Sequence, residues 1–168
     1  MIEIMVLPSA VIEGKNVPSD TLVISIVSPY VQHPMIHGEH IYKFAFYDVT
    51  EEYLVDDRLI QPMAYEIAES IVEICMNHRD KKRWIIHCEA GISRSPGVAI
   101  GLARYIDLNL NVEKLWKMFP HHNKYVRKNI ETAMQRKLDE IEENLKTMLS
   151  PGPVPDRLDK SCIDPHGF

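Results

Sequence analysis

Residues whose side chains could carry out chemistry fall within one short stretch of the 168-residue chain. Cys88 offers a thiol, and Arg94 follows six residues later with a planar guanidinium that can bind two oxygens of one phosphate at once. Gly91 between them lets the backbone turn inward. A cysteine nucleophile and a bidentate anion clamp within one turn of chain predict chemistry on phosphate esters.

The segments on either side of this stretch are expected to position it. Residues 83–86 form a short, mainly apolar run that predicts a buried strand, and residues 96–106 predict a helix with Pro96 in its first turn. Backbone N–H groups would then converge beside a helix N-terminus, where the helix dipole favours an anion and the thiolate form of Cys88. The residues expected to bind phosphate in this way are Glu89, Ala90, Gly91, Ile92, Ser93 and Arg94.

The run from His87 to Ser95 resembles the signature of protein tyrosine phosphatases, in which five residues separate a cysteine from an arginine. With His87 before Cys88 and Ser95 after Arg94, it looks like the dual-specificity branch, and the resemblance extends over about residues 21–127. It implies hydrolysis of phosphotyrosine, phosphoserine or phosphothreonine in proteins through a cysteinyl-phosphate, with no metal and no cofactor. Cys88 would be the nucleophile and Arg94 the phosphate clamp.

Three further residues are expected to assist Cys88. Ser95 can donate a hydrogen bond to the sulfur and so make it a better leaving group in the second step. His87 is expected to orient the cysteine by hydrogen bonding, with a role as acid or base as the alternative. Asn123 ends a short stretch that resembles one found near the site in related small phosphatases. A supporting role and an ordinary helix N-terminus both remain open for it.

The resemblance also implies an aspartate that protonates the leaving oxygen, a contribution of typically 10²–10⁴-fold in rate. Asp48 directly follows the aromatic-rich segment 41–47 and should leave the sheet at the same edge as Cys88. Asp56 and Asp57 precede an apolar helical stripe, where aspartate is most often an N-cap. Asp48 is therefore the predicted general acid, and the alternative is that it caps a turn. The absence of a Trp-Pro-Asp triplet argues against the strictly tyrosine-specific branch.

The remaining pattern predicts an α/β fold with a central, mainly parallel sheet of about four or five strands flanked by helices. Residues 2–6 read as an edge strand, residues 21–27 as a central strand buried on both faces, and residues 41–46 as a third strand. Residues 47–57 read as a loop. An apolar stripe that begins at Leu59 predicts a helix from Arg58 to about Asn77.

The C-terminal part of the chain predicts a short helix over residues 112–118 and a long one over residues 124–149. The long helix carries an apolar stripe that is expected to pack on the core. Its members are Val126, Ile130, Met134, Leu138, Ile141, Leu145 and Met148. We therefore expect one dual-specificity phosphatase-like domain over residues 1–150, with an extended C-terminal helix, and a tail over residues 151–168.

Composition narrows the classes of function. The net charge of −5 and a pI near 5.9 speak against a nucleic-acid partner, and no apolar run approaches the roughly 20 residues of a membrane span. The first residues do not resemble a signal peptide, and the three widely spaced cysteines favour reduced thiols, which predicts a cytoplasmic protein. The expected partner is a phosphorylated protein or a small phosphomonoester. Oligomeric state and preference among phosphorylated residues stay open.

Other functions are compatible with a cysteine-to-arginine loop. One is a non-catalytic phosphate-binding module, and others are an RNA 5′-triphosphatase, which the acidic pI opposes, and an arsenate reductase, which would need Cys75 or Cys162 as a resolving thiol. A redox bridge from Cys88 to either cysteine would need close Cα atoms. The histidines of residues 33–40 are expected to lie in a loop rather than to bind a metal.

Overall fold

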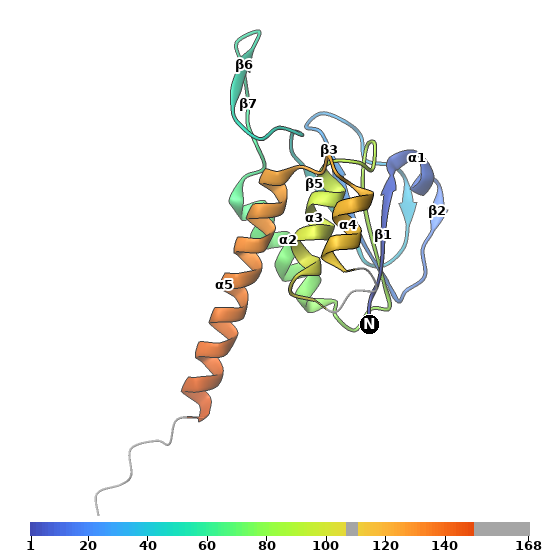
Figure 1. The fold of residues 1–168 in the computed structure, drawn as a ribbon. Helices are drawn as coiled ribbons and strands as arrows, with labels where there is room; N and C mark the ends of the chain where they lie inside the picture. The colour runs from blue at the N-terminus through green and yellow to red at the C-terminus, as the bar shows by residue number, and fades with distance from the viewer. Residues whose placement is uncertain (107–110, 150–168) are drawn as a thin grey trace, which may run out of the picture.

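A four-stranded parallel sheet forms the centre of the computed structural model, which describes residues 1–106 and 111–149 (Figure 1). The strands lie in the order β1-β8-β3-β5, and each neighbouring pair is parallel. The predicted α/β fold with a central parallel sheet is thus confirmed, with the first strand at an edge. The four strands are β1 Glu3–Pro8, β3 Thr21–Val27, β5 Ile41–Ala45 and β8 Arg83–Cys88.

The composition of β3 explains its central place. All seven of its residues are buried, and most of them are β-branched, as expected for a strand that helices and loops cover on both faces. Pairing with β8 sets Ser25 opposite His87, so the carboxyl ends of these strands lie at one edge of the sheet. Ligands of open parallel sheets bind at this edge, and Cys88 is the last residue of β8.

Helices pack mainly on one face of the sheet and enclose the larger part of the core. These are α2 Tyr65–Asn77, α3 Arg94–Ala103 and α5 Lys124–Leu149, with the shorter α4 Val112–Met118 beside α3. On the other face, a small cluster of Ile12, Val23 and Ile85 lies under α1 Ser9–Ile12 and the strands β2 Lys15–Asn16 and β4 Ile36–His37. The sheet is therefore covered on both sides.

Close packing between α3 and α5 fixes where α5 begins. A Cβ atom on Gly97 would lie 2.8 Å from the backbone oxygen of Asn123, and one on Gly101 would lie 2.7 Å from Cβ of Ile130. Any larger residue at these two positions would push the helices apart. The two glycines thus place the start of α5 next to the start of α3, at the edge of the sheet where Cys88 lies.

The helix predicted from Arg58 is wrong over about its first two turns. Residues Tyr53–Val55 and Arg58–Ile60 form the antiparallel strands β6 and β7, and α2 begins only at Tyr65. Asp56 and Asp57 have φ angles of 46° and 61° and form the two-residue turn between the strands. Such left-handed turns match the twist of a hairpin and tolerate aspartate. The residue that seemed to start the helical stripe, Leu59, instead belongs to β7.

Two smaller expectations also change. The segment predicted as a loop, residues 47–57, contains β6, because the turn at Asp56 folds it onto β7. The helix that follows Cys88 begins at Arg94 and ends at Ala103, three residues before the predicted end. The predicted short helix over residues 112–118 is confirmed, and the side chain of Asn111 caps it by accepting a hydrogen bond from Lys114 N at 2.8 Å.

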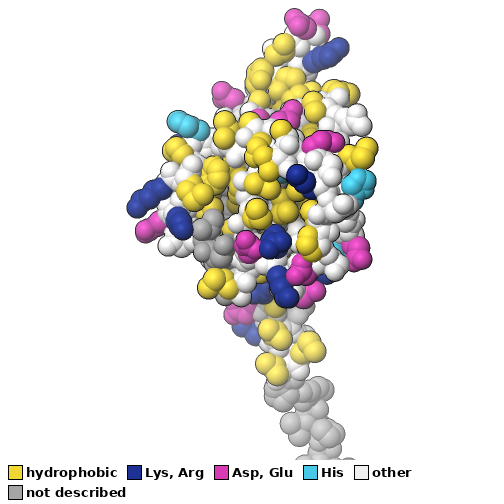
Figure 2. Space-filling view, turned by 90° about the vertical axis from the view of Figure 1, so that its right-hand side faces the viewer, with side chains coloured by type: hydrophobic (Ala, Val, Ile, Leu, Met, Phe, Trp, Pro, Cys, Tyr) yellow, Lys and Arg dark blue, Asp and Glu magenta, His cyan; other side chains and the backbone are white. Residues whose placement is uncertain are grey.

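The predicted bounds of α5 are confirmed, but only its first half packs on the core. Met134 is fully buried, whereas Ile141, Leu145 and Met148 are 38%, 52% and 81% exposed. The second half of the helix extends beyond the domain, so these residues have no core beneath them (Figure 1). Figure 2 shows hydrophobic side chains on this projecting end below the domain and on the β6–β7 hairpin above it. The predicted tail, with Cys162, lies outside the described residues.

Among the residues that the structure describes, no helix is long and apolar enough to cross a bilayer.

Candidate active site

The loop between β8 and α3 wraps around the side chain of Cys88. Gly91 has a φ angle of 71°, and a Cβ atom there would lie 2.6 Å from the backbone nitrogen of Pro8 at the end of β1. Only glycine satisfies both the left-handed conformation and this close approach. The neighbouring strand thus supports the loop from behind and holds it in its tight turn.

The sulfur of Cys88 lies within a set of hydrogen-bond donors. Gly91 N donates to Sγ at 3.3 Å and Ser95 Oγ donates at 3.1 Å, and the cysteine is only 2% exposed. The ten-residue helix α3 begins at Arg94, so its positive dipole end lies at the same loop. Two donors and a helix N-terminus stabilise negative charge on sulfur. The contact expected from Ser95 is present.

Arg94 is buried, and its guanidinium is held from two sides. Nη1 donates to the backbone oxygen of Phe46 at 2.9 Å and to Ser28 Oγ at 3.2 Å, while Nη2 donates to the carboxylate of Glu89. Nε is buried and has no hydrogen-bond partner within the described part of the chain. A buried donor without a hydrogen-bond partner is rare, and this one is free to donate to an anion. The other donors keep the guanidinium plane fixed for such an anion.

Glu89 joins the loop to the end of β3. Its Oε2 accepts from Ser28 N at 3.2 Å and from Ser28 Oγ at 2.8 Å, in addition to the ion pair with Arg94. Burial alone would raise the pKa of this carboxyl, but the hydrogen bonds from Arg94 and Ser28 outweigh it and lower the pKa below its ordinary value. Glu89 is therefore a paired anion that closes the loop from Arg94 to β3.

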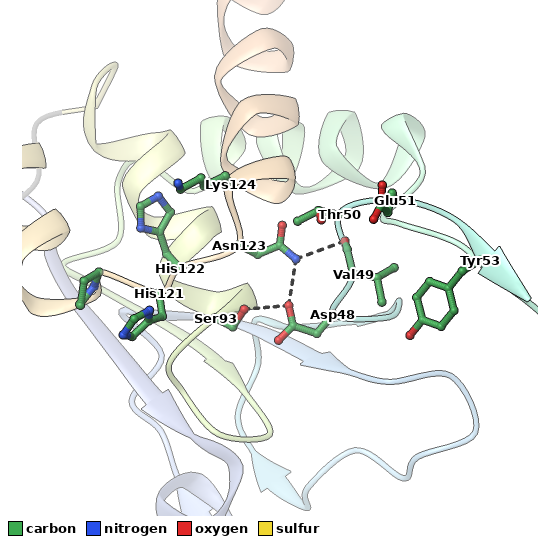
Figure 3. A pocket seen from close by; sticks show the side chains of 11 residues that line it. Asp48, Val49, Thr50, Glu51, Tyr53, Ser93, His121, His122, Asn123 and Lys124 are labelled. Atoms are coloured by element: carbon green, nitrogen blue, oxygen red, sulfur yellow. Dashed lines mark hydrogen bonds between the residues drawn. The ribbon is translucent and has the colours of Figure 1, made fainter. Parts of the chain in front are cut away.

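Asp48 lies beside the loop, as predicted. Its Oδ1 accepts from Ser93 Oγ at 2.8 Å and from Asn123 Nδ2 at 2.9 Å (Figure 3). Its Oδ2 lies 3.9 Å from Arg94 Nε. The competing pair, Asp56 and Asp57, forms the tip of the β6–β7 hairpin, which projects from the domain (Figure 1). Of the three candidate aspartates, only Asp48 has contacts with the loop.

His87 is fully buried behind the loop and acts on Cys88 only indirectly. Its Nδ1 lies 3.3 Å from Ser9 Oγ, and the same hydroxyl donates to the backbone oxygen of Cys88 at 3.3 Å. Burial lowers the pKa of His87 to about 4, and nearby His33 adds to the effect, so the ring is neutral at physiological pH. A neutral ring held by Ser9 fits the expected orienting role better than the alternative of an acid or base.

A cavity of about 520 Å³ opens beside Asp48. Residues 48–51 and the start of the hairpin line one side, and the turn before α5 lines the other, with Ser93 and Asn123 between them (Figure 3). Lys124 and His121 supply polar surface, while Val49 and Tyr53 supply apolar surface. The cavity gives room for a group attached to an ester oxygen that faces Asp48.

Sequence reasoning missed Ser9 and Ser28, which hold His87 and Glu89. Both are the first residues after parallel strands, Ser9 after β1 and Ser28 after β3, and so they reach the edge of the sheet where Cys88 lies. A rule that every polar residue directly after a parallel strand is a candidate would have found them. Within the described part of the chain, no three His, Cys, Asp or Glu side chains gather as metal ligands would.

Comparisons with protein-family models, curated proteins and solved structures found no match to this chain. What the fold and the site define is an α/β protein with a central parallel sheet, whose carboxyl edge carries a cysteine-to-arginine loop with an aspartate beside it.

Proposed function

We propose that the chain is a phosphatase that hydrolyses phosphate monoesters of the kind found in phosphotyrosine, phosphoserine and phosphothreonine, through a cysteinyl-phosphate. The observation that carries this proposal is the convergence of Gly91 N and Ser95 Oγ on Cys88 Sγ, inside the loop that Arg94 closes. A structural thiol has no need of two donors on its sulfur, or of a buried guanidinium in the same loop whose Nε has no hydrogen-bond partner among the described residues. These features fit a thiolate and a tetrahedral oxyanion.

In the first step, the Cys88 thiolate attacks phosphorus in line with the leaving oxygen. The S–P bond forms as the P–O bond to the leaving group breaks, and Asp48 gives its proton to the departing oxygen. Charge that spreads over the other three phosphate oxygens is stabilised by the loop N–H groups and by Arg94. The cavity beside Asp48 holds the leaving group.

In the second step, water attacks the cysteinyl-phosphate and Asp48, now a carboxylate, accepts a proton from it. The S–P bond breaks, inorganic phosphate leaves, and the thiolate returns with its hydrogen bond from Ser95. That bond lowers the energy of the departing sulfur anion, so Ser95 acts mainly in this step. Asp48 therefore serves first as an acid and then as a base.

Hydrolysis of a small aryl phosphate without added metal, at about pH 6, tests the proposal. Wild type should turn over, Cys88→Ser should be inactive, and Asp48→Asn should be slower by roughly 10²–10⁴-fold. Arg94→Lys should also be strongly impaired, because a point charge cannot replace the planar fork. Asp56→Asn serves as the matched control, because this aspartate lies in the hairpin turn, and it should leave the rate unchanged.

Two results would overturn the proposal. If wild type binds inorganic phosphate but hydrolyses nothing, the site is that of a phosphate-binding module. If arsenate is reduced instead, the protein belongs to another class of enzyme. Against arsenate reduction, Cys75 is fully buried, and burial raises the pKa of its thiol, which makes it a poor partner in disulfide exchange.

A further inference from the structure

Two donors from different parts of the chain meet on the same oxygen of Asp48. Ser93, in the loop after Cys88, donates its hydroxyl hydrogen to Oδ1 at 2.8 Å, and Asn123, before the first residue of α5, donates from Nδ2 at 2.9 Å. The other oxygen, Oδ2, accepts no hydrogen bond from the described residues and lies 3.9 Å from Arg94 Nε. Figure 3 shows the side chains of Ser93 and Asn123 pointing toward Asp48 from different sides.

This arrangement distinguishes the two carboxyl oxygens. A protonated carboxyl carries its hydrogen on one oxygen only, and Oδ1 already accepts two hydrogen bonds. The acidic proton must therefore reside on Oδ2, the oxygen that faces the guanidinium of Arg94. We propose that Ser93 and Asn123 form a latch that holds Asp48 so that Oδ2 exchanges the proton with the leaving oxygen and then with water. The proposal rests on the phosphatase function proposed above.

The orientation of the Asn123 amide is fixed by its other contacts. Its Oδ1 accepts from Val126 N at 3.0 Å as the cap of α5, and its Nδ2 also donates to the backbone oxygen of Val49 at 3.3 Å. Turning the amide over would place a nitrogen against a backbone N–H and would lose all of these bonds. Asn123 therefore presents a donor, and not an acceptor, to Asp48.

The backbone of Asn123 ties the latch to the loop itself. Asn123 N donates to the backbone oxygen of Ser93 at 3.0 Å, and Asn123 is only 4% exposed. The close approach of Gly97 to Asn123 leaves no space for this segment to move inward. The position of the acid is therefore set by the same contacts that join the loop after Cys88 to the start of α5.

The variant Asn123→Asp distinguishes the hydrogen bond that Asn123 donates to Asp48 from the cap that Asn123 provides for α5. Aspartate keeps an oxygen that can cap Val126 N, but it removes the donor to Asp48 and places a second carboxylate beside it. Asn129→Asp is the matched control, because it makes the same substitution later on α5. The Nδ2 of Asn129 donates to Met63 O at 3.4 Å. Ser93→Ala removes the other donor while it keeps the loop backbone.

The test is kcat/KM over a series of aryl phosphates whose leaving groups differ in pKa. A leaving group of high pKa depends on the acid, whereas one of low pKa departs without it. We expect kcat/KM of Asn123→Asp to fall by about tenfold to 10²-fold with the poorest leaving groups and to change little with the best. Ser93→Ala should show the same dependence on the leaving group, with a smaller loss of kcat/KM. Asn129→Asp should follow wild type throughout the series.

Addition of Asn123→Asp to Asp48→Asn gives the second readout. If Asn123 acts through the acid, the double variant is no slower than Asp48→Asn alone. A loss that is equal for all leaving groups, or one that adds fully to Asp48→Asn, would reduce Asn123 to a structural role and overturn the latch. If Ser93→Ala shows no dependence on the leaving group, the two-donor form of the proposal is wrong. No hydrolysis by wild type would refute the phosphatase function itself.

Discussion

Glu89 shows how far the role of one residue depends on its neighbours. A negative charge so close to Cys88 would by itself repel a phosphate group. In the structure, the carboxylate forms an ion pair with Arg94 and accepts hydrogen bonds from Ser28, and so it orients the guanidinium. A fixed guanidinium loses less conformational entropy when it binds phosphate. Glu89 is therefore part of the preorganisation of the site.

Glu89→Ala should weaken phosphate binding, because Arg94 loses the partner that holds Nη2. A hydrogen bond to a charged group contributes roughly 1.5–3 kcal/mol, and the 38% exposure of the Glu89 side chain reduces this, so kcat/KM should fall about tenfold. Glu89→Gln keeps an acceptor and should lose less. Competitive inhibition by inorganic phosphate measures the effect directly. Tighter inhibition in Glu89→Ala would mean that Glu89 competes with the ligand for Arg94.

At the scale of helices and strands, hydrophobic patterns were a good guide wherever burial decided the structure. The central strand β3, the strand before Cys88 and the bounds of α5 were all predictable, because a run of β-branched residues or a stripe at helical spacing has few alternatives. The β6–β7 hairpin was not predictable in the same way. Its residues are largely exposed, and Asp56 and Asp57 adopt a turn conformation that periodicity does not report.

The candidate site, too, was predictable in part from the sequence. Cys88, Arg94 and Ser95 lie in one continuous motif, and Asp48 lies at the end of a predictable strand, so their proximity followed from the expected topology. The contacts of Ser9 and Ser28 depend on which strands are neighbours in the sheet, and this order is not contained in a periodic pattern. The donor role of Asn123 depends on the packing of α5 against α3, which the glycines of α3 permit.

The stripe along α5 gives a direct test of which half contributes to stability. Met134 is fully buried against the domain, and its replacement by alanine should lower the free energy of unfolding by about 2–5 kcal/mol. Leu145 is 52% exposed on the projecting half, so Leu145→Ala should change the free energy of unfolding by less than about 0.5 kcal/mol. Chemical denaturation of the two variants measures the difference. Equal losses would show that the projecting half is covered by something in the folded protein.

At the scale of the whole molecule, the buried histidine behind the loop couples stability to pH. In the unfolded chain His87 titrates near its ordinary pKa of 6.5, and in the folded protein burial lowers this pKa to about 4. Between these values the unfolded state binds more protons, so the free energy of unfolding must decrease as the pH falls from about 6.5 towards 4. His33, whose pKa is also lowered by burial and by Lys43, acts in the same direction.

We expect this loss to reach about 3 kcal/mol for His87 at the acid end of the range. Denaturation curves collected across this pH range should show a steeper pH dependence for wild type than for His87→Asn, which keeps a donor towards Ser9 but does not titrate. Glu89, with its lowered pKa, adds a loss at still lower pH in both proteins. Parallel curves for the two proteins would show that His87 is not held neutral in the fold.

The central claim is that Cys88 becomes covalently phosphorylated during turnover, and rapid acid quenching followed by mass spectrometry tests it most directly. Asp48→Asn should be used with an aryl phosphate of low leaving-group pKa, because the first step then needs no acid while the second is slowed. We predict a phosphoryl group on the peptide that contains Cys88, and none in Cys88→Ser. Hydrolysis without any such adduct, or hydrolysis that persists in Cys88→Ser, would contradict the account.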